Sequence, residues 1–484
     1  MMNAIVTRLT WILRSGPAGD CKSVAPARSC GGAVDTTPRA ACTGWAVPAQ
    51  TPRRRLAVTI RVVRENAPMA ATMTGTRIRY MGNKVALSGR VASLVAAMPP
   101  DRPLVDLFSG MCSVAGAVAP SGRRVMVNDI QQYARLVASC LITASGPPPT
   151  PSVAAEALWL GYDDNLAALT DRFDAALREE RHILESPSAE AYHRVQRAWR
   201  HIGNDDALAS EAQRQREHPE GPRRVATLTF AWGYFGLRQA IELDSLRAGI
   251  DVATSRGVLT ASQAAWCRLA LLQVASRVAS TPGHFAQFLR GNSPAAMSRV
   301  IRSRRRSVRT GFFEDLAVLR PFGTVAWRRR NHVLTLDAVQ LWPALDAVVP
   351  DPAIFYADPP YSKEHYSRFY HVLETLERYD YPPAEGLGRY RPDRFATPLG
   401  TRRGVVPSLN AICSQIAARD GCLLLSYPSS GLLTRDLGVD PYDLLATHFR
   451  DVELAICEEH LHSTLGARHG DAQRQVTEYV WIAQ

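Results

Sequence analysis

The most specific chemical pattern in the chain is the run Tyr356-Ala-Asp358-Pro359-Pro360-Tyr361, which follows a short apolar stretch. Two successive prolines stiffen the backbone and remove two N–H donors, so the carbonyls there can only accept hydrogen bonds. A carboxylate, a fixed carbonyl and an aromatic face together suit a planar amine. Asp358 and the Pro359 carbonyl can accept its two N–H bonds, while Tyr361 stacks on its ring. The alternative is a Pro-Pro strand terminator with a solvated aspartate.

A second group of residues has the pattern of a nucleoside-binding site. Asp106-Leu-Phe108-Ser-Gly110 ends a strand-like run, and a tight glycine turn there lets backbone N–H groups approach a ligand at a helix N-terminus. Asn128-Asp129 ends the next run, 23 residues after Asp106, where an acid can accept hydrogen bonds from ribose hydroxyls. Because a glycine turn alone has purely structural uses, the prediction depends on the combination with Asp129.

Short apolar runs must position both groups. Five runs of strand length occur, at residues 103–108, 124–128, 353–357, 422–426 and 479–483. They alternate with helical stretches, which predicts an α/β fold with a parallel or mostly parallel sheet and helices on both faces. Between about 145 and 320, Ala-rich or charge-rich segments have helical spacing and little strand character, namely 153–160, 166–181 and 261–278. We expect this part to be a mainly helical inserted domain.

The composition is that of an ordinary globular protein. The chain has 484 residues, 46% hydrophobic and 21% charged, which suits two or three domains with a large core. Its net charge of +12 and pI of about 9.5 favour a polyanionic partner, since neutralised phosphates release counterions; an Arg-rich genome is the alternative. Nine scattered cysteines without a CxxC pair predict neither a zinc site nor a disulfide scaffold. With no apolar run near the ~18 residues of a membrane span, we expect a soluble cytoplasmic protein.

The motifs, taken in order, resemble those of the Dam-type (alpha-class) N6-adenine DNA methyltransferases. The matching elements are Arg79-Tyr80-Met-Gly82-Asn-Lys84, Asp106-Leu-Phe-Ser-Gly110, Asn128-Asp129 and Asp358-Pro-Pro-Tyr361. The resemblance runs from about residue 77 to the C-terminus. It implies a Rossmann-like S-adenosylmethionine-dependent methyltransferase sheet with a helical target-recognition insert. It also implies methyl transfer from S-adenosylmethionine to N6 of an adenine flipped out of double-stranded DNA.

The resemblance also implies roles for individual residues in cofactor binding. The residues that would line the methionine end of S-adenosylmethionine are Tyr80, Gly82 and Lys84. The cofactor loop would consist of Asp106, Phe108 and Gly110. Asp129 would bind the ribose, and Asp337 resembles the acid that contacts the adenine of the cofactor. Cys112 departs from the family, which usually has a second glycine at that position.

Catalysis is assigned by the resemblance to Asp358, Pro359, Pro360 and Tyr361, and no metal ion is required. Residues 363–370 would form a loop that closes over the flipped base. Arg302 to Arg306, with Arg309, are candidate phosphate contacts or a solvated charged face. The aromatic cluster at 230–235 is interpreted as hydrophobic core rather than a base-stacking surface, and Glu459, His460 and His462 as loop residues.

These assignments divide the chain into four parts. Residues 1–75, with ten Lys/Arg, three acids and no periodic apolar pattern, are interpreted as a disordered or mis-started N-terminal extension. Residues 76–144 and 321–484 would form the two parts of the catalytic domain, and 145–320 the target-recognition insert. We expect a monomer whose partner is double-stranded DNA; a cognate restriction endonuclease is a further candidate partner.

The alternative activities differ from this one in the residues that they need. An N4-cytosine DNA methyltransferase would use the same amine chemistry, but in its common form Ser replaces the Asp of the tetrapeptide. RNA and protein-glutamine methyltransferases usually carry Asn there. A cytosine-C5 enzyme needs a nucleophilic cysteine in a Pro-Cys setting, and none of the nine has one. A decayed methylase that only binds DNA stays open as the non-enzymatic alternative.

Overall fold

The computed structural model describes residues 76–78, 85–350, 352–363, 366–463 and 473–484. All of them belong to one compact unit, Val63–Gln484. The predicted extension 1–75 and three of the predicted cofactor residues, Tyr80, Gly82 and Lys84, lie outside the described residues.

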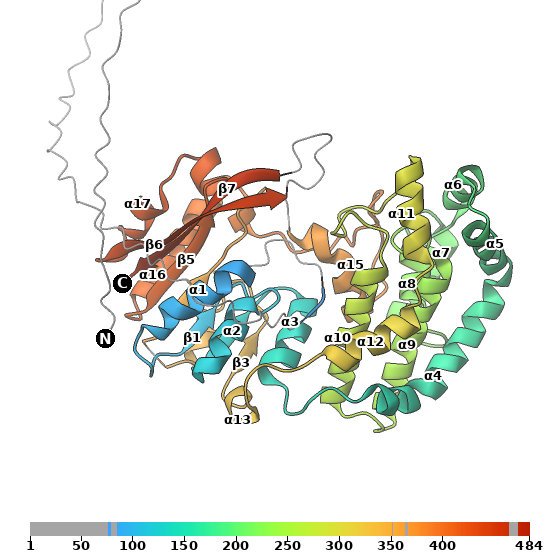
Figure 1. Cartoon of the computed structure of the whole chain (residues 1–484), viewed down its shortest axis with the longest axis horizontal. Helices are drawn as coiled ribbons and strands as arrows, with labels where there is room; N and C mark the ends of the chain where they lie inside the picture. Colours follow the sequence, from blue (N-terminus) through green and yellow to red (C-terminus); the bar gives the residue numbers. More distant parts are fainter. Residues whose placement is uncertain (1–75, 79–84, 351, 364–365, 464–472) are drawn as a thin grey trace, which may run out of the picture. The chain divides into compact units, whose positions relative to one another are not determined.

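Seven strands in the described part of the chain form one sheet in the order β3-β2-β1-β4-β5-β7-β6 (Figure 1). Their bounds are β1 (Leu104–Asp106), β2 (Val125–Asn128), β3 (His332–Leu334), β4 (Ile354–Ala357), β5 (Cys422–Pro428), β6 (Val452–Ser463) and β7 (Gln473–Ala483). Strands β1 to β5 pair in parallel, while β7 runs antiparallel between β5 and β6. The order 3-2-1-4-5 is that of doubly wound nucleotide-binding sheets. The fold is therefore mixed α/β, consistent with the expected methyltransferase-like architecture.

The sheet separates two hydrophobic layers because successive side chains of a strand point to opposite faces. Leu104, Val125 and Ile354 belong to one layer, whereas their neighbours Val105, Met126 and Phe355 belong to the other. The first layer is covered by α1 (Val85–Ala96), α2 (Ser113–Val118), η1 (Ala119–Ser121), α3 (Gln132–Ala138), η2 (Ser139–Thr143) and α15 (Tyr366–Arg378). The second is covered by α14 (Trp342–Asp346), α16 (Val405–Ala417), η4 (Leu432–Asp436) and α17 (Pro441–Leu445). Two short turns, α13 (Val325–Arg328) and η3 (Pro398–Gly400), complete this part.

The chain between β2 and β3 is helical over most of its length. It contains α4 (Pro151–Arg172), α5 (Asp174–Glu185), α6 (Ala189–Ala198), α7 (Asp206–Glu217), α8 (Val225–Phe230), α9 (Leu237–Ser255), α10 (Ala261–Val278), α11 (Pro294–Arg304) and α12 (Val308–Val318). Helix α10 has the range predicted from the sequence. The predicted stretch 166–181 is divided at Phe173, where α4 ends and α5 begins.

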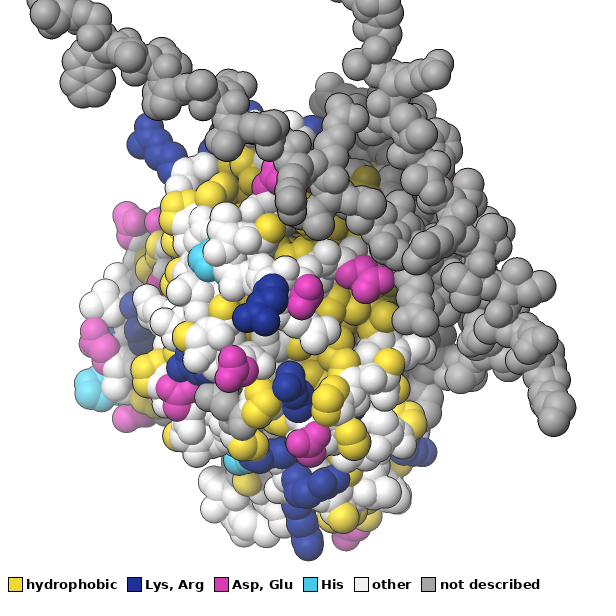
Figure 2. Space-filling model, turned by 90° about the vertical axis from the view of Figure 1, so that its left-hand side faces the viewer, with side chains coloured by type: hydrophobic (Ala, Val, Ile, Leu, Met, Phe, Trp, Pro, Cys, Tyr) yellow, Lys and Arg dark blue, Asp and Glu magenta, His cyan; other side chains and the backbone are white. Residues whose placement is uncertain are grey.

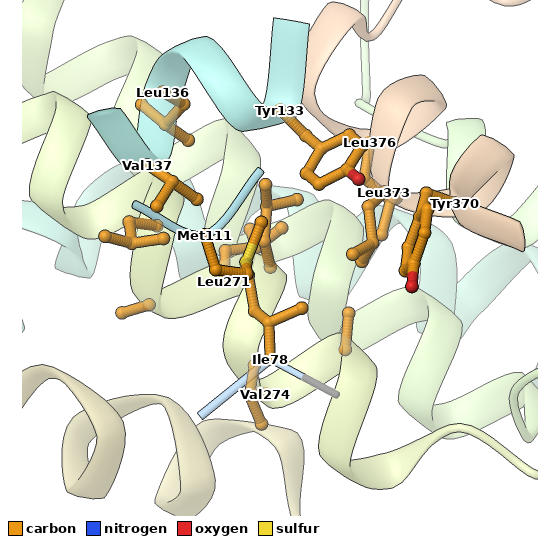
Figure 3. Close-up of a cluster of buried hydrophobic side chains, with 14 of the residues drawn as sticks. Ile78, Met111, Tyr133, Leu136, Val137, Leu271, Val274, Tyr370, Leu373 and Leu376 are labelled. Carbon is orange, nitrogen blue, oxygen red and sulfur yellow. The ribbon is translucent and has the colours of Figure 1, made fainter. Parts of the chain in front are cut away.

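The helical segment shares its hydrophobic core with the sheet. Figure 3 shows Met111, from the loop after β1, surrounded by Leu271 and Val274 of α10, Val137 of α3 and Ile78. In Figure 1, α10, α12 and α15 accordingly lie between the sheet and the outer helices α4 and α5. The backbone N–H of Arg77 also donates to Gln273 Oε1 of α10 at 2.6 Å. Helix α10 thus packs against the loop that follows β1, and it also accepts a hydrogen bond from Arg77.

Each of the five predicted apolar runs forms a strand, and two strands were missed. β3 is only three residues long, and β6 carries charged residues such as Glu458 and Glu459. The interpretation of Glu459, His460 and His462 as loop residues is wrong, since all three belong to β6. Both missed strands are edge strands of this sheet, where one-sided pairing tolerates short length and charged side chains.

Charges of both signs are mixed on the surface at the sheet end of the molecule. Figure 2 shows Lys and Arg beside Asp and Glu there, with apolar patches between them. Seven of the twelve net positive charges belong to residues 1–75, and five to residues 76–484. The net charge of the whole chain therefore overstates the positive charge of the folded part. Among the described residues, none of the helices combines the length and apolarity needed to span a bilayer.

Candidate functional site

A cavity of about 890 Å³, its open mouth included, lies at the carboxyl ends of β1, β2 and β4. The order of the sheet reverses between β1 and β4, and ligands of doubly wound folds bind in the crevice outside such a point. Seven of the predicted site residues line the cavity: Asp106, Phe108, Gly110, Asp129, Asp337, Asp358 and Pro360. The structure thus brings together residues separated by about 250 positions in the sequence.

The loop after β1 is fixed by the end of β2. Gly110 has a φ of 47°, which is in the left-handed region that glycine tolerates. Its backbone N–H donates to Asp129 Oδ2 at 3.1 Å, and the Gln131 N–H donates to Asp129 Oδ1 at 3.0 Å. The Ser109 N–H donates to the Asn128 carbonyl at 2.9 Å. Since a carboxylate has about four acceptor positions, Asp129 can hold this turn and still accept from a ligand hydroxyl.

Cys112 occupies a position that suits glycine. Its φ of 60° and ψ of 29° are left-handed, and a residue with a side chain pays roughly 1–2 kcal/mol in that conformation. The Cys112 side chain is fully buried in the core layer that faces the helical segment and is absent from the residues that line the cavity. The departure from the family pattern therefore adds backbone strain without narrowing the cavity.

Asn128 connects the two sides of the cavity. Its amide nitrogen donates to the Leu107 carbonyl at 3.2 Å and to the Leu336 carbonyl at 3.0 Å, and its amide oxygen accepts from the Leu336 N–H at 3.1 Å. Leu336 directly precedes Asp337, and both line the cavity. Asn128 is thus a positioning residue for Asp337, although the sequence only suggested it as the neighbour of Asp129.

Only some residues of the run 358–361 face the cavity. Asp358 and Pro360 line the cavity, whereas Pro359 and Tyr361 are not among its lining residues. Tyr361 is half-buried against the second hydrophobic layer, and its ring centroid lies 6.4 Å from that of Tyr366 in an edge-on arrangement. Tyr366 does line the cavity, as do Phe108, Tyr356 and Phe395, so the cavity has aromatic surface without Tyr361.

Several further lining residues were missed from the sequence, among them Phe395, Thr397 and Leu399. Phe395 and Thr397 reach the cavity from the segment between α15 and η3. That segment has neither strand nor helix pattern, so no periodicity signalled it. Tyr366 was within the predicted closing loop 363–370, but it is the first residue of α15; His365 and Glu364 lie outside the described residues.

The cavity is strongly acidic. Its lining contains Asp106, Asp129, Asp337 and Asp358, and no Lys or Arg of the described residues. Burial raises the pKa of Asp106 to about 8, and the neighbouring Asp358 and Asp129 add to this, partly offset by the hydrogen bond from the Phe108 N–H. Burial also raises the pKa of Asp129, against the hydrogen bonds from Gln131 and Gly110. A cation in the cavity would stabilise the ionised forms.

A second cavity of about 1290 Å³ adjoins the first, with which it shares Ile130, Gln131 and Phe395. Its charged lining is largely paired. Arg378 and Arg391 each contact both Asp380 and Asp393, at distances of 2.7 to 3.0 Å. Two cations therefore balance two anions on this side of the site.

One arginine of the basic run 302–306 is buried, whereas Arg302, Arg305 and Arg306 are exposed. Arg304 is buried between the rings of Tyr192 and Trp232. Arg305 donates to the Leu184 carbonyl and Arg306 to the Arg277 carbonyl, at 2.5 and 2.6 Å. Arg304 is therefore not placed to contact a phosphate, while the exposed arginines of the run are consistent both with phosphate contacts and with a solvated charged face. The prediction that the 230–235 aromatics are core is confirmed, since Phe230, Trp232, Tyr234 and Phe235 are all buried.

Comparison with known proteins gives two relatives over parts of the chain. Modification methylase LlaI from Lactococcus lactis subsp. lactis is 23% identical over 207 residues, which cover 43% of this chain and 30% of the relative. Type II methyltransferase M.FokI from Planomicrobium okeanokoites is 36% identical over 84 residues, which cover 17% of this chain and 13% of the relative. The chain thus matches less than a third of the length of either curated relative. No protein-family model matches it.

Proposed function

We propose that this protein is a DNA methyltransferase that transfers a methyl group from S-adenosylmethionine to N6 of adenine in double-stranded DNA. The observation that carries the proposal is the convergence of four aspartates, Asp358 among them, in one cavity at the switch point of the sheet. The two relatives named as DNA modification methylase and type II methyltransferase support the same activity. Their names also keep a cognate restriction endonuclease as a candidate partner.

The residues of the cavity fit S-adenosylmethionine. Asp129 would accept the ribose hydroxyls, and the Gly110 turn and Phe108 would lie along the cofactor. Asp337, held across the cavity by Asn128, would meet the adenine end. When bound, the cofactor supplies a methyl group on a positively charged sulfur. That charge suits a lining with four aspartates and no described Lys or Arg.

Asp358 and Pro359 would bind the amine that receives the methyl group. The Asp358 carboxylate and the Pro359 carbonyl would each accept one N–H of the exocyclic amine. These bonds pull electron density onto the nitrogen, whose lone pair is otherwise delocalised into the ring. A base inside a duplex cannot reach such a cavity, so the target nucleotide has to be flipped out. Orientation of the two reactants and preorganised acceptors would supply most of the rate gain.

The flipped base would stack on Tyr366 and Phe395 rather than on Tyr361. Tyr366 and Phe395 line the cavity, while Tyr361 packs edge-on against Tyr366. In this arrangement Tyr361 fixes the orientation of the aromatic face that contacts the base. Asp358 as the first residue of the tetrapeptide favours adenine over N4 of cytosine.

Transfer of tritium from labelled S-adenosylmethionine to duplex DNA tests the proposal, followed by nucleoside analysis of the product. We expect N6-methyladenine. N4-methylcytosine alone would contradict the choice of base but not the amine chemistry. Binding of DNA without any transfer would favour the decayed-methylase alternative.

A further inference from the structure

Three cations gather on one carboxylate at the edge of the candidate site. Asp436, the last residue of η4, lies 2.8 Å from Lys363 Nζ, 2.9 Å from Arg435 Nε and 3.8 Å from Arg402 Nη2. The Asp436 side chain is only 9% exposed, whereas the three cationic side chains are 56 to 59% exposed. The largely buried carboxylate thus pairs with three cationic side chains that remain exposed to solvent.

The cluster adjoins the cavity through all three of its segments. Lys363 follows Pro360, a lining residue, by three positions. The Leu432 N–H at the start of η4 donates to the Tyr361 carbonyl at 2.7 Å. Arg402 follows η3, whose Leu399 lines the cavity, and a Cβ on Gly400 would lie 3.4 Å from the Ser362 carbonyl. Since three residues span at most about 11 Å, the cations lie within about a nucleotide or two of the cavity.

The charge of these side chains is not balanced, unlike that of the Arg378 and Arg391 network that lines the adjoining cavity. Arg378 and Arg391 share two aspartates and form a neutral network. Among the described residues, the ion-pair partner shared by Lys363, Arg402 and Arg435 is Asp436, so these four side chains together carry a net charge of +2. The Lys363 ammonium and the Arg435 guanidinium hold the pKa of Asp436 at about 2. The acid is therefore ionised at neutral pH, and the excess of positive charge comes from cations that are already prearranged.

We propose that Lys363, Arg402 and Arg435 clamp backbone phosphates of DNA beside the nucleotide that enters the cavity. This inference rests on the proposed function. Two phosphodiesters carry the two negative charges that the cluster lacks, and arginine forks match phosphate oxygens. Because Asp436 holds the three side chains in place, less conformational entropy is lost on binding than for free surface cations. The clamp fixes the position of the strand on the duplex without reading its sequence.

The test is the salt dependence of binding to a mixed-sequence DNA duplex. The triple variant Lys363→Gln, Arg402→Gln, Arg435→Gln should bind more weakly, and the slope of log K against log salt should become shallower by about 1.8, at about 0.9 for each of two lost phosphate contacts. The control is Arg450→Gln, which removes an exposed arginine at the opposite, amino-terminal end of β6 and should leave the slope unchanged. Thermal melting checks that both variants fold like the wild type.

An unchanged slope and affinity in the folded triple variant would overturn the clamp, as would failure of the wild type to bind duplex DNA. Methyl transfer by the wild type is assayed in parallel. Transfer with an unchanged slope in the variant rejects the clamp and leaves the proposed function intact. Absence of transfer with a shallower slope rejects the proposed function and supports the clamp as a DNA contact.

Discussion

Two buried aspartates of this molecule have the same burial and different surroundings. Asp244, in the helical segment, is fully buried and accepts four hydrogen bonds, from the Ala226 N–H, the Thr227 N–H and hydroxyl, and the Tyr379 hydroxyl, at 2.5 to 2.8 Å. Burial raises its pKa to about 6, with these donors opposing the rise. Asp106, at the cavity, has one such donor and two neighbouring aspartates, and its pKa is raised to about 8.

The difference separates a structural carboxylate from one that faces a ligand site. In Asp244 the protein itself supplies the donors, so the charge is accommodated within the fold. In Asp106, Asp129 and Asp358 the protein gathers like charges around open volume, which costs stability unless a cation or a donor enters. Such perturbed groups in a cleft are typical of functional sites.

The largest effect expected is on stability, from Asp244→Ala. The substitution would leave four buried donors without an acceptor, and each unsatisfied group costs roughly 1–3 kcal/mol. We expect a loss of about 4 kcal/mol or more in the free energy of unfolding, measured by urea denaturation. Methyl transfer per folded molecule should be retained. A stability near that of the wild type would show that Asp244 is not needed to satisfy these buried donors.

The next largest effect is on the rate, from Asp358→Asn. The substitution keeps the shape but offers a weaker acceptor and can direct a donor at the amine. We expect at least a ~100-fold loss of methyl transfer, the scale of one preorganised polar group, and Asp358→Ala should lose as much. Binding of duplex DNA should persist, since phosphates supply most of that affinity. A rate near that of the wild type, or a loss that merely follows unfolding, would reject the role of Asp358.

A smaller effect concerns the pH dependence of cofactor binding. S-adenosylmethionine carries a positive charge that S-adenosylhomocysteine lacks, so ionised Asp106 should favour the former. Because the pKa of Asp106 is about 8 in the free protein, its charge appears as the pH rises toward 8. The affinity ratio of the two ligands should therefore increase with pH by up to tenfold per unit and level off above about 8.

Isothermal titration with both ligands between pH 6 and 9 measures that ratio. Asp106→Asn cannot ionise and should give a flatter dependence at every pH. A ratio independent of pH in the wild type would show that the charge of Asp106 does not act on the ligand.

The smallest effect is expected from Arg305→Gln. Arg305 is exposed, but its Nε and Nη2 both donate to the Leu184 carbonyl, so two sides of its guanidinium are already occupied within the helical segment. The salt dependence of DNA binding should stay within about 0.3 of the wild-type slope, against a full contact value of about 0.9. A decrease of the slope by about 0.9 would instead show that Arg305 contacts a phosphate.

The sequence predicted the strands and the acids that follow them, because apolar runs and strand-end motifs are local patterns. The same locality explains what was missed. Phe395 and Thr397 have no periodic neighbours, and the Asp436 cluster joins residues from three distant segments. In the run at 302–306, Arg302, Arg305 and Arg306 are exposed as a charged face should be, but Arg304 is buried between two aromatic rings whose positions the sequence does not give. The edge strand β6 was missed because charged residues such as Glu458 and Glu459 interrupt its apolar pattern.

If the protein has the proposed function, the shared core has a consequence for how its target site could change. Leu271 and Val274 of α10 belong to the same apolar layer as Met111 of the loop after β1. The helices between β2 and β3 therefore do not have a hydrophobic core separate from that of the sheet. If this segment were exchanged between two homologues, the apolar side chains of the new α10 would no longer fit those of the loop after β1. Recombination at its ends should therefore yield mostly insoluble chimaeras. Under the proposed function, specificity would then diverge through substitutions on the outward faces of helices such as α5 and α7, where side chains can change without altering the shared core.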